Sequence, residues 1–185
     1  MPGWDAIRDF DQKNPPIKEL DKYIESLYEY EETPEVEDFM KLLMIHGNLI
    51  SNPEFKDGFN NWQIETSLEE RQYTLGKDGV FISSDANFDY SISQTVDIEY
   101  TGEYIAAVEY RGTNTTGVEV ELFMDVEDES GVHTYTSDIF PADVRFVTHL
   151  LKPVRLQKNA RVTVGLRMHT PPVFAKIKKI SLVVI

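Results

Sequence analysis

The spacing of hydrophobic residues changes near Gly47. Upstream, two sets recur at helical spacing: Ile17, Leu20, Tyr23, Ile24 and Leu27, then Val36, Phe39, Met40, Leu43 and Met44. Thr33-Pro34-Glu35 reads as a cap followed by proline at the first helical position, and Gly47 reads as the end of that helix. The pattern predicts a short N-terminal helical segment over residues 1–47.

Downstream of Asn48 the hydrophobic period becomes two, which is typical of strands with one buried face. The predicted strands are 61–66, 71–75, 79–83, 88–98, 102–111, 117–127, 132–138, 144–152, 160–168 and 173–184. Glycine-containing turns separate them, and no helical pattern intervenes. The chain is therefore predicted to be mostly β, with an antiparallel β-sandwich of jelly-roll type over residues 48–185.

Alternation also assigns the two faces of each strand. Three rows are predicted to face the core: Tyr104, Ala106, Val108 and Tyr110; Val118, Val120, Leu122, Met124 and Val126; and Ala160, Val162, Val164, Leu166 and Met168. Their neighbours Glu109, Glu119, Glu121, Phe123 and Asp125 are predicted to point away from it. Most of these outward charges are expected only to keep the surface of the protein soluble.

Charge and composition narrow the possible partners. The 185 residues carry a formal net charge of −14 and no cysteine. We expect no nucleic-acid partner, because phosphate binding needs a basic stripe, and no anionic membrane surface for the same reason. No apolar run is long enough to span a bilayer, and Met1-Pro2-Gly3-Trp4-Asp5 does not read as a signal peptide.

These features fit either a cytosolic protein or a fragment of a longer secreted chain. An extracellular or cell-surface location is expected in the second case, and the location stays open in the first. Residues 1–47, where acidic residues outnumber basic ones, likewise fit two settings. They form either helices packed on the sandwich or each other, or an acidic arm that is the tail of an upstream catalytic domain.

Three motifs give the β-rich part a family resemblance. They are Asn48-Leu49 with Asn52-Pro53, Phe55, Gly58 and Trp62; Ser93-Gln94-Thr95-Val96 before Gly102-Glu103-Tyr104; and the closing Lys178-Lys179-Ile180-Ser181-Leu182. Through these three motifs the sequence resembles the galactose-binding-like jelly rolls, above all carbohydrate-binding modules of families four, nine and twenty-two. The resemblance covers about residues 48–185 and implies that Trp62 is a core anchor.

The resemblance implies a non-catalytic carbohydrate-binding module, accessory to a glycoside hydrolase acting on plant-type polysaccharide. The expected partners are a neutral oligo- or polysaccharide and an upstream catalytic domain, and no cofactor is expected. The alternative is a structural or protein-interaction jelly roll that has lost sugar binding. A hydrolytic enzyme is supported only by carboxylate pairs such as Glu119 and Glu121, since no catalytic motif occurs.

Sugar binding needs an aromatic platform flanked by planar hydrogen-bonding groups. Phe123 is the one aromatic residue on the outward row of its predicted strand, and Glu109, Glu121, Arg161 and Arg167 are the polar groups expected around it. Tyr135 joins this candidate set because related modules place ligand contacts near strand ends. These six residues are the predicted ligand-binding site.

The resemblance further implies a structural calcium site, held by an acid after the first aromatic residue and by the aspartate of the closing strand. Here Lys56, Lys178 and Lys179 occupy those positions. Lysine cannot ligate calcium, which needs several oxygen ligands. Unless Glu54 or Asp57 takes over by a one-residue shift, the metal site is predicted to be lost.

Chelation is therefore expected to leave the melting temperature unchanged, because only a bound ion could stabilise the folded state by mass action. Thermal melts with and without a chelator measure this. A melting temperature that falls on chelation and recovers with calcium, but not with magnesium, would show that an ion is bound.

Overall fold

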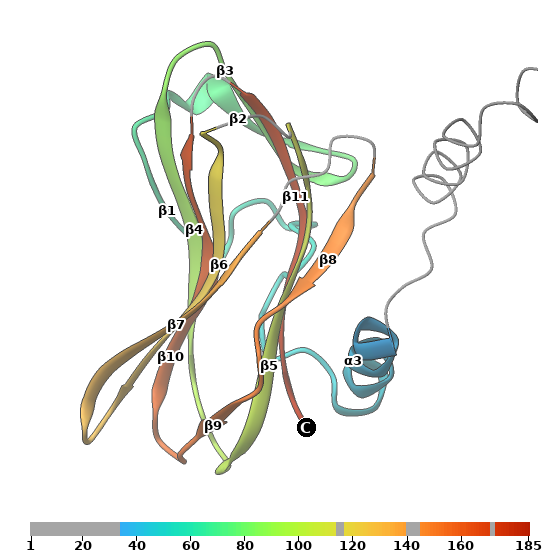
Figure 1. Cartoon of the computed structure of the whole chain (residues 1–185), viewed down its shortest axis with the longest axis vertical. Helices are drawn as coiled ribbons and strands as arrows, with labels where there is room; N and C mark the ends of the chain where they lie inside the picture. The colour runs from blue at the N-terminus through green and yellow to red at the C-terminus, as the bar shows by residue number, and fades with distance from the viewer. Residues whose placement is uncertain (1–33, 114–116, 140–144, 171–172) are drawn as a thin grey trace, which may run out of the picture. The chain divides into compact units, whose positions relative to one another are not determined.

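The computed structural model describes residues 34–113, 117–139, 145–170 and 173–185, and within them two antiparallel sheets pack face to face (Figure 1). Sheet A has the strand order β1 (Gln63–Thr66), β4 (Phe88–Asp97), β10 (Arg161–Thr170), β6 (Glu119–Asp128) and β7 (Gly131–Asp138). Sheet B has the order β2 (Tyr73–Gly76), β3 (Gly79–Ser84), β11 (Val173–Val184), β5 (Gly102–Gly112) and β8 (Val147–Leu150). This confirms the predicted mostly-β sandwich.

Most predicted strands match observed ones to within a few residues. Two elements were not predicted: the short strand β9 (Val154–Leu156), which pairs with β5, and the 3₁₀ turn η1 (Glu70–Gln72). The expected strand over 144–152 is shorter in the described region, where only β8 is extended. The predicted helix over 17–27 lies outside the described residues.

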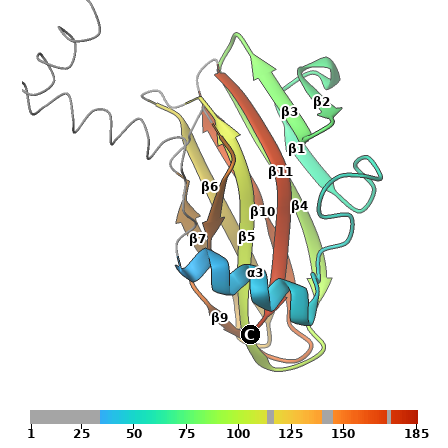
Figure 2. The same ribbon diagram turned by 90° about the vertical axis from the view of Figure 1, so that its right-hand side faces the viewer.

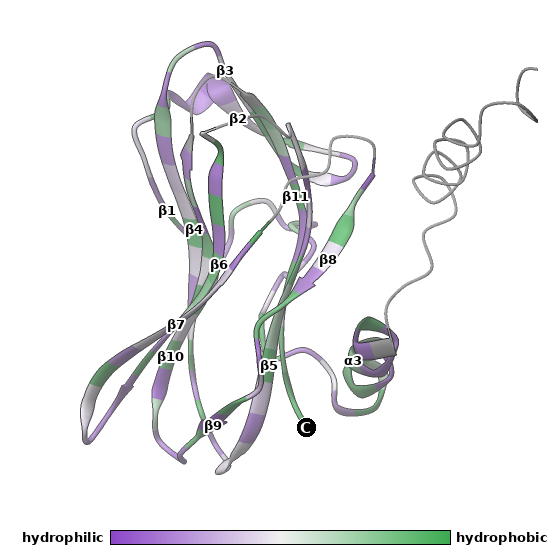
Figure 3. Cartoon of the chain, in the orientation of Figure 1, coloured by the Kyte–Doolittle hydropathy of each residue, from purple (hydrophilic) through white to green (hydrophobic). Residues whose placement is uncertain are grey.

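The core lies between the two sheets and follows the predicted alternation. Tyr104, Ala106, Val108 and Tyr110 on β5 are all buried, as are Leu122 and Met124 on β6. Hydrophilic and hydrophobic residues alternate along the long strands in Figure 3. Because directly paired residues on antiparallel strands share a face, the outward side chains form rows that cross each sheet.

The helix α3 (Pro34–His46) packs on the outer face of sheet B, where it lies across β5 and β11 (Figure 2). Phe39 is 2% exposed and packs against Ala107 and Val183. Gly47 ends the helix with φ 76°, and its N–H donates to the Leu43 carbonyl at 3.0 Å. Among the described residues, no helix is long and apolar enough to cross a membrane.

The expected apolar stripe of α3 is wrong at one position. Met44 is 86% exposed. It lies about 100° further round the helix than Leu43, which contacts the sheet, so it points past the edge of the contact surface. The neighbouring Ile45 is also exposed, at 73%.

The segment that leads into the sandwich is fixed by two asparagine side chains. Asn48 Oδ1 accepts hydrogen bonds from the Ile50 and Leu182 backbone N–H groups at 3.1 and 3.0 Å, and its amide donates to Ser181 Oγ. Asn52 Oδ1 accepts from the Asp57 N–H at 3.0 Å. In the first motif of the family resemblance, Asn48 thus joins the segment to the closing strand, and Asn52 closes the turn within the segment.

Trp62 completes this segment. Its ring is 8% exposed and lies 4.9 Å from the ring of Phe55, and its indole N–H donates to the Asn52 carbonyl at 3.0 Å. The buried Gln94 side chain holds the same segment from β4 through both the N–H and the carbonyl of Ser51. The prediction that Trp62 is a core anchor is confirmed.

Trp62→Ala is expected to lower the free energy of unfolding by about 3–5 kcal/mol, because it removes a buried aromatic ring and leaves a cavity. Chemical denaturation measures the change. Tyr100→Ala, at an aromatic side chain that is 72% exposed, is the control and should change the free energy by no more than about 0.5 kcal/mol. Equal stability of Trp62→Ala and the wild type, with loss of ligand binding, would instead make Trp62 a ligand platform.

Candidate functional site

A groove of about 1050 Å³ opens on the outer face of sheet A, at the end where β6 begins and β10 ends. All five strands of the sheet contribute to its lining. Its charged side chains are Glu65, Asp89, Glu119, Glu121, Asp138, Arg167 and His169. The groove therefore has a surplus of carboxylates, with one arginine and one histidine among them.

Strand register brings these side chains into two cross-strand rows. The first contains Glu65, Ser91, Arg167, Glu121 and Asp138, in order from β1 to β7. The second contains Asp89, His169 and Glu119. Residues far apart in sequence meet because each occupies an outward position on its own strand.

Arg167 is the centre of the first row. Its guanidinium carbon lies 4.1 Å from the centroid of the Phe123 ring, and its Nε lies 2.8 Å from a Glu121 carboxylate oxygen. Stacking on the ring and the charge of Glu121 restrict the guanidinium plane. That plane is a polar surface that lines the groove.

Phe123 differs from the prediction in exposure. It occupies the outward register as expected, but the ring is only 4% exposed because Arg167 lies over it. The prediction that Phe123 forms an open aromatic platform is therefore wrong. An arginine–phenylalanine stack takes its place.

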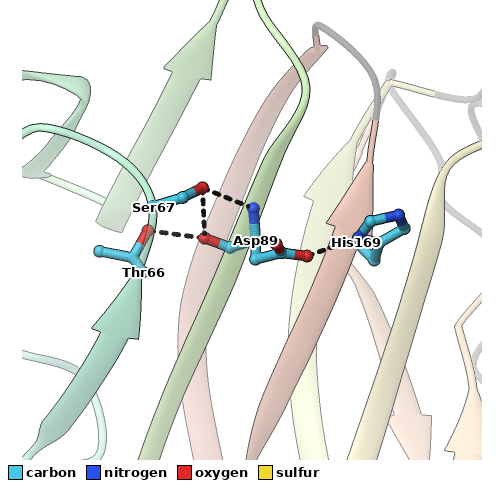
Figure 4. A network of polar contacts seen from close by, with 4 residues as sticks. All are labelled: Thr66, Ser67, Asp89 and His169. Atoms are coloured by element: carbon cyan, nitrogen blue, oxygen red, sulfur yellow. Dashed lines mark hydrogen bonds and ion pairs between the residues drawn. The ribbon is translucent and has the colours of Figure 1, made fainter.

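The second row contains an ion pair that joins β4 to β10. His169 Nδ1 lies 2.5 Å from Asp89 Oδ1, and both side chains are well exposed (Figure 4). The hydrogen bond to Asp89, its charge and the charge of Glu119 raise the pKa of His169 above its ordinary value. The imidazolium thus persists to higher pH than in an isolated histidine.

The backbone of Asp89 is held by hydrogen bonds with the last residue of β1 and with the residue that follows β1. The Thr66 hydroxyl donates to the Asp89 carbonyl at 2.7 Å, and the Asp89 N–H donates to Ser67 Oγ at 2.9 Å (Figure 4). These bonds fix the start of β4 and hence the position of the carboxylate that faces His169. The Ser67 hydroxyl bonds to the Asp89 backbone and not to His169, so the geometry does not form a nucleophile–base pair.

Only three of the six predicted site residues lie together: Phe123, Glu121 and Arg167. Arg161 is on the same face, but it is six residues along β10, where it pairs with Asp97 at 3.7 Å. Its position is outside the groove lining.

Glu109 and Tyr135 were wrongly grouped with this site. Glu109 belongs to β5 in sheet B and forms an ion pair with Lys178 at 2.9 Å. Tyr135 pairs with Met124, whose side chain faces the core, so Tyr135 points away from the face that carries Phe123. It lies on the edge strand β7 and is 40% exposed.

The lysines at the expected calcium positions surround a carboxylate. Glu54 forms ion pairs with Lys56 and, at 3.8 Å, with Lys179. Both ammonium groups, together with Lys178, lower the pKa of the Glu54 carboxyl, with the Lys56 contact the largest cause. Within the described ranges, no cluster of three or more His, Asp or Glu side chains is arranged to hold a metal ion.

Sequence reasoning missed Asp89, His169, Glu65 and Asp138. His169 has the same parity along β10 as Arg161 and Arg167, so its outward direction was readable from the sequence. Its partner could not be read from the sequence, because Asp89 and His169 are 80 residues apart and meet only through the pairing of β4 with β10.

Comparison with known proteins shows a likeness in fold alone. No protein-family model matches the sequence, and no curated protein matches it. Among solved structures, the chain is similar to TmCBM61 in complex with β-1,4-galactotriose, at 16% identity and a TM-score of 0.61, over 75% of this chain and 99% of that one. The chain therefore has the jelly-roll fold of a carbohydrate-binding module.

Two further structures show the same fold. One is the CBM22-1 xylan-binding domain of Paenibacillus barcinonensis Xyn10C, at 9% identity and a TM-score of 0.53, over 75% of this chain and 95% of that one. The other is the enzymatically active domain of tailspike protein 4 from bacteriophage CBA120, at 13% identity and a TM-score of 0.56, over 75% of this chain and 21% of that one. The sandwich thus occurs both as a separate module and within a larger enzyme.

Replacing Asp89 by asparagine is expected to lower the pKa of His169 towards its ordinary value, because the hydrogen-bonded carboxylate is the largest cause of the rise. The pair is intact below the raised pKa and is lost as the pH increases through it. An NMR titration of the imidazole protons measures the shift. Asp125→Asn, on the same face but outside the groove lining, should leave the His169 titration unchanged.

Proposed function

We propose that this protein is a non-catalytic carbohydrate-binding module that holds a neutral oligosaccharide in the groove of sheet A. One observation carries the proposal. The row Glu65, Ser91, Arg167, Glu121 and Asp138 runs across all five strands, inside a groove, on the fold of a carbohydrate-binding module. A row of this kind can follow the successive rings of an extended sugar chain.

The side chains of the row match the chemistry of a pyranose. Carboxylates accept hydrogen bonds from sugar hydroxyls, and the guanidinium of Arg167 donates to hydroxyl oxygens. The plane of Arg167, supported by Phe123, offers a flat surface to the C–H face of the ring. Specificity in such a site comes from a few placed polar groups.

The charge of the groove favours neutral sugars over uronic acids. Five carboxylates line it, against Arg167 and the His169 imidazolium. A carboxylated sugar would meet a local negative field there. Because the floor offers a single stacked platform, the expected dissociation constant is about high-micromolar to millimolar.

The best-placed carboxylates already have cationic partners, which supports binding over hydrolysis. Glu121 is paired with Arg167, and Asp89 with His169. A glycosidase needs a carboxyl that is free to reach the leaving oxygen, and each of these two carboxylates is already held by a cationic side chain. As an accessory module, the chain would work beside a glycoside hydrolase on plant-type polysaccharide, outside the cell or on its surface.

A second candidate is a structural or protein-interaction jelly roll without sugar binding. It is favoured by the burial of the two aromatic rings nearest the groove, Phe123 and Tyr90, at 4% and 1% exposure. Aromatic stacking supplies much of the affinity of sugar sites. Under this reading the polar groove would bind no glycan.

Arg167→Lys is expected to weaken glycan binding by about three- to tenfold, because lysine keeps the charge but loses the planar donor surface. Affinity gel electrophoresis of the full chain in β-1,4-galactan and in xylan measures retention. Arg161→Lys, on the same strand but outside the groove, is the matched control and should bind as the wild type does.

The outcomes separate the two candidates. Retention of the wild type that only Arg167→Lys reduces supports the groove. Equal loss in both variants would place binding elsewhere. A wild type that no neutral glycan retards, and that a glycan array also fails to capture, would leave the structural jelly roll as the function.

A further inference from the structure

The outer face of sheet B has a different character from the groove. Beyond the area that α3 covers, aromatic and basic side chains lie beside one another on β3, β11 and β5. Phe81, Lys176 and Arg111 form one cross-strand row, because Lys176 is paired with Phe81 on one side and with Arg111 on the other. Together with Phe146, Phe174 and Lys178, these residues define an aromatic–basic face.

Three cation–aromatic contacts connect the residues of this face. Lys176 Nζ lies 5.7 Å from the Phe81 ring centroid, Arg111 Cζ lies 6.0 Å from that of Phe174, and Lys178 Nζ lies 5.6 Å from that of Phe146. Each contact keeps a positive charge beside an apolar ring. Phe81 is 37% exposed, so its ring is open to a ligand in solution.

One strand of each sheet carries charge of a single sign. β11 carries Lys176, Lys178 and Lys179 and no acidic residue, whereas β6 carries five acidic residues and no basic one. Packed sheets lie about 10 Å apart, and outward side chains extend the distance between the outer faces. The Debye length is about 8 Å at physiological ionic strength, so the acidic face is largely screened from a ligand on sheet B.

The lysines of β11 differ in how far carboxylates neutralise them. Lys178 is paired with Glu109 at 2.9 Å, and Lys179 lies 3.8 Å from Glu54. Lys176 has no carboxylate within ion-pair distance in the described part of the chain. Its charge, next to the exposed Phe81, is therefore available to an anion.

We infer that the aromatic–basic face is a second binding site, which takes a carboxylated polysaccharide of the polyuronate type. A uronate residue combines an apolar C–H face, which fits the Phe81 ring, with a carboxylate, which fits Lys176. An extended polymer repeats this combination, and a sheet surface that carries three neighbouring cation–ring pairs suits it. The site goes beyond the groove function and does not depend on it.

Affinity gel electrophoresis with the full chain tests the site, with polygalacturonate as the probe. The matched neutral probe is the same polymer fully methyl-esterified, which keeps the sugar rings and removes the charge. At about 0.15 M salt the wild type should be retarded by polygalacturonate and not by the ester, and retardation should decline as salt increases. Lys176→Gln should weaken binding about three- to tenfold.

Two control variants make the result decisive. Lys152→Gln removes an exposed lysine outside the face and should bind polygalacturonate as the wild type does. Arg167→Lys should likewise keep this binding, so that failure of the groove proposal and failure of this one are distinguishable.

Three results would overturn the inference: no retardation of the wild type, equal weakening by Lys152→Gln and Lys176→Gln, or equal retardation by polyglutamate. The last would mean that the face recognises negative charge alone and not a sugar ring.

Discussion

The apolar contact between the inner faces of the two sheets is the constraint on which the rest of this structure depends. Burial of residues such as Ile92, Leu122 and Leu166 requires that every second position on the long strands be hydrophobic. The intervening positions are thereby fixed in direction, and strand pairing places them in straight rows. The groove and the aromatic–basic face are both consequences of how the core is packed.

This dependence explains why the fold was largely predictable. Alternation identified the strands and the inward residues, because period two is a local property of the sequence. It could not reveal β9, where three residues are too few to show a period, nor the exposure of Met44, which depends on where the helix meets the sheet. The helical segment before Pro34 remains a prediction.

The candidate site was less predictable because it is made of pairings between strands. Parity correctly put Phe123, Glu121 and Arg167 on outward positions, yet parity alone cannot tell which sheet a strand joins. Glu109 was therefore assigned to the wrong face. Nor does parity show what lies over a side chain, and so Phe123 was expected to be open when Arg167 covers it. The net charge of −14 also conceals the contrast between β6, which carries only acidic charges, and β11, which carries only lysines.

The ties between the entry segment and β11 have a consequence for synthesis on the ribosome. β11 lies between β3 and β5, so sheet B lacks a central strand until β11 has been made. The hydrogen bond from Asn48 to Ser181 likewise cannot form until Ser181, 133 residues later in the chain, has been made. Long-range closure of this kind is slow, and unpaired edges are prone to aggregate in the interval. The nascent chain must therefore keep the apolar faces of β3 and β5 apart from other chains until translation supplies the strand that joins them.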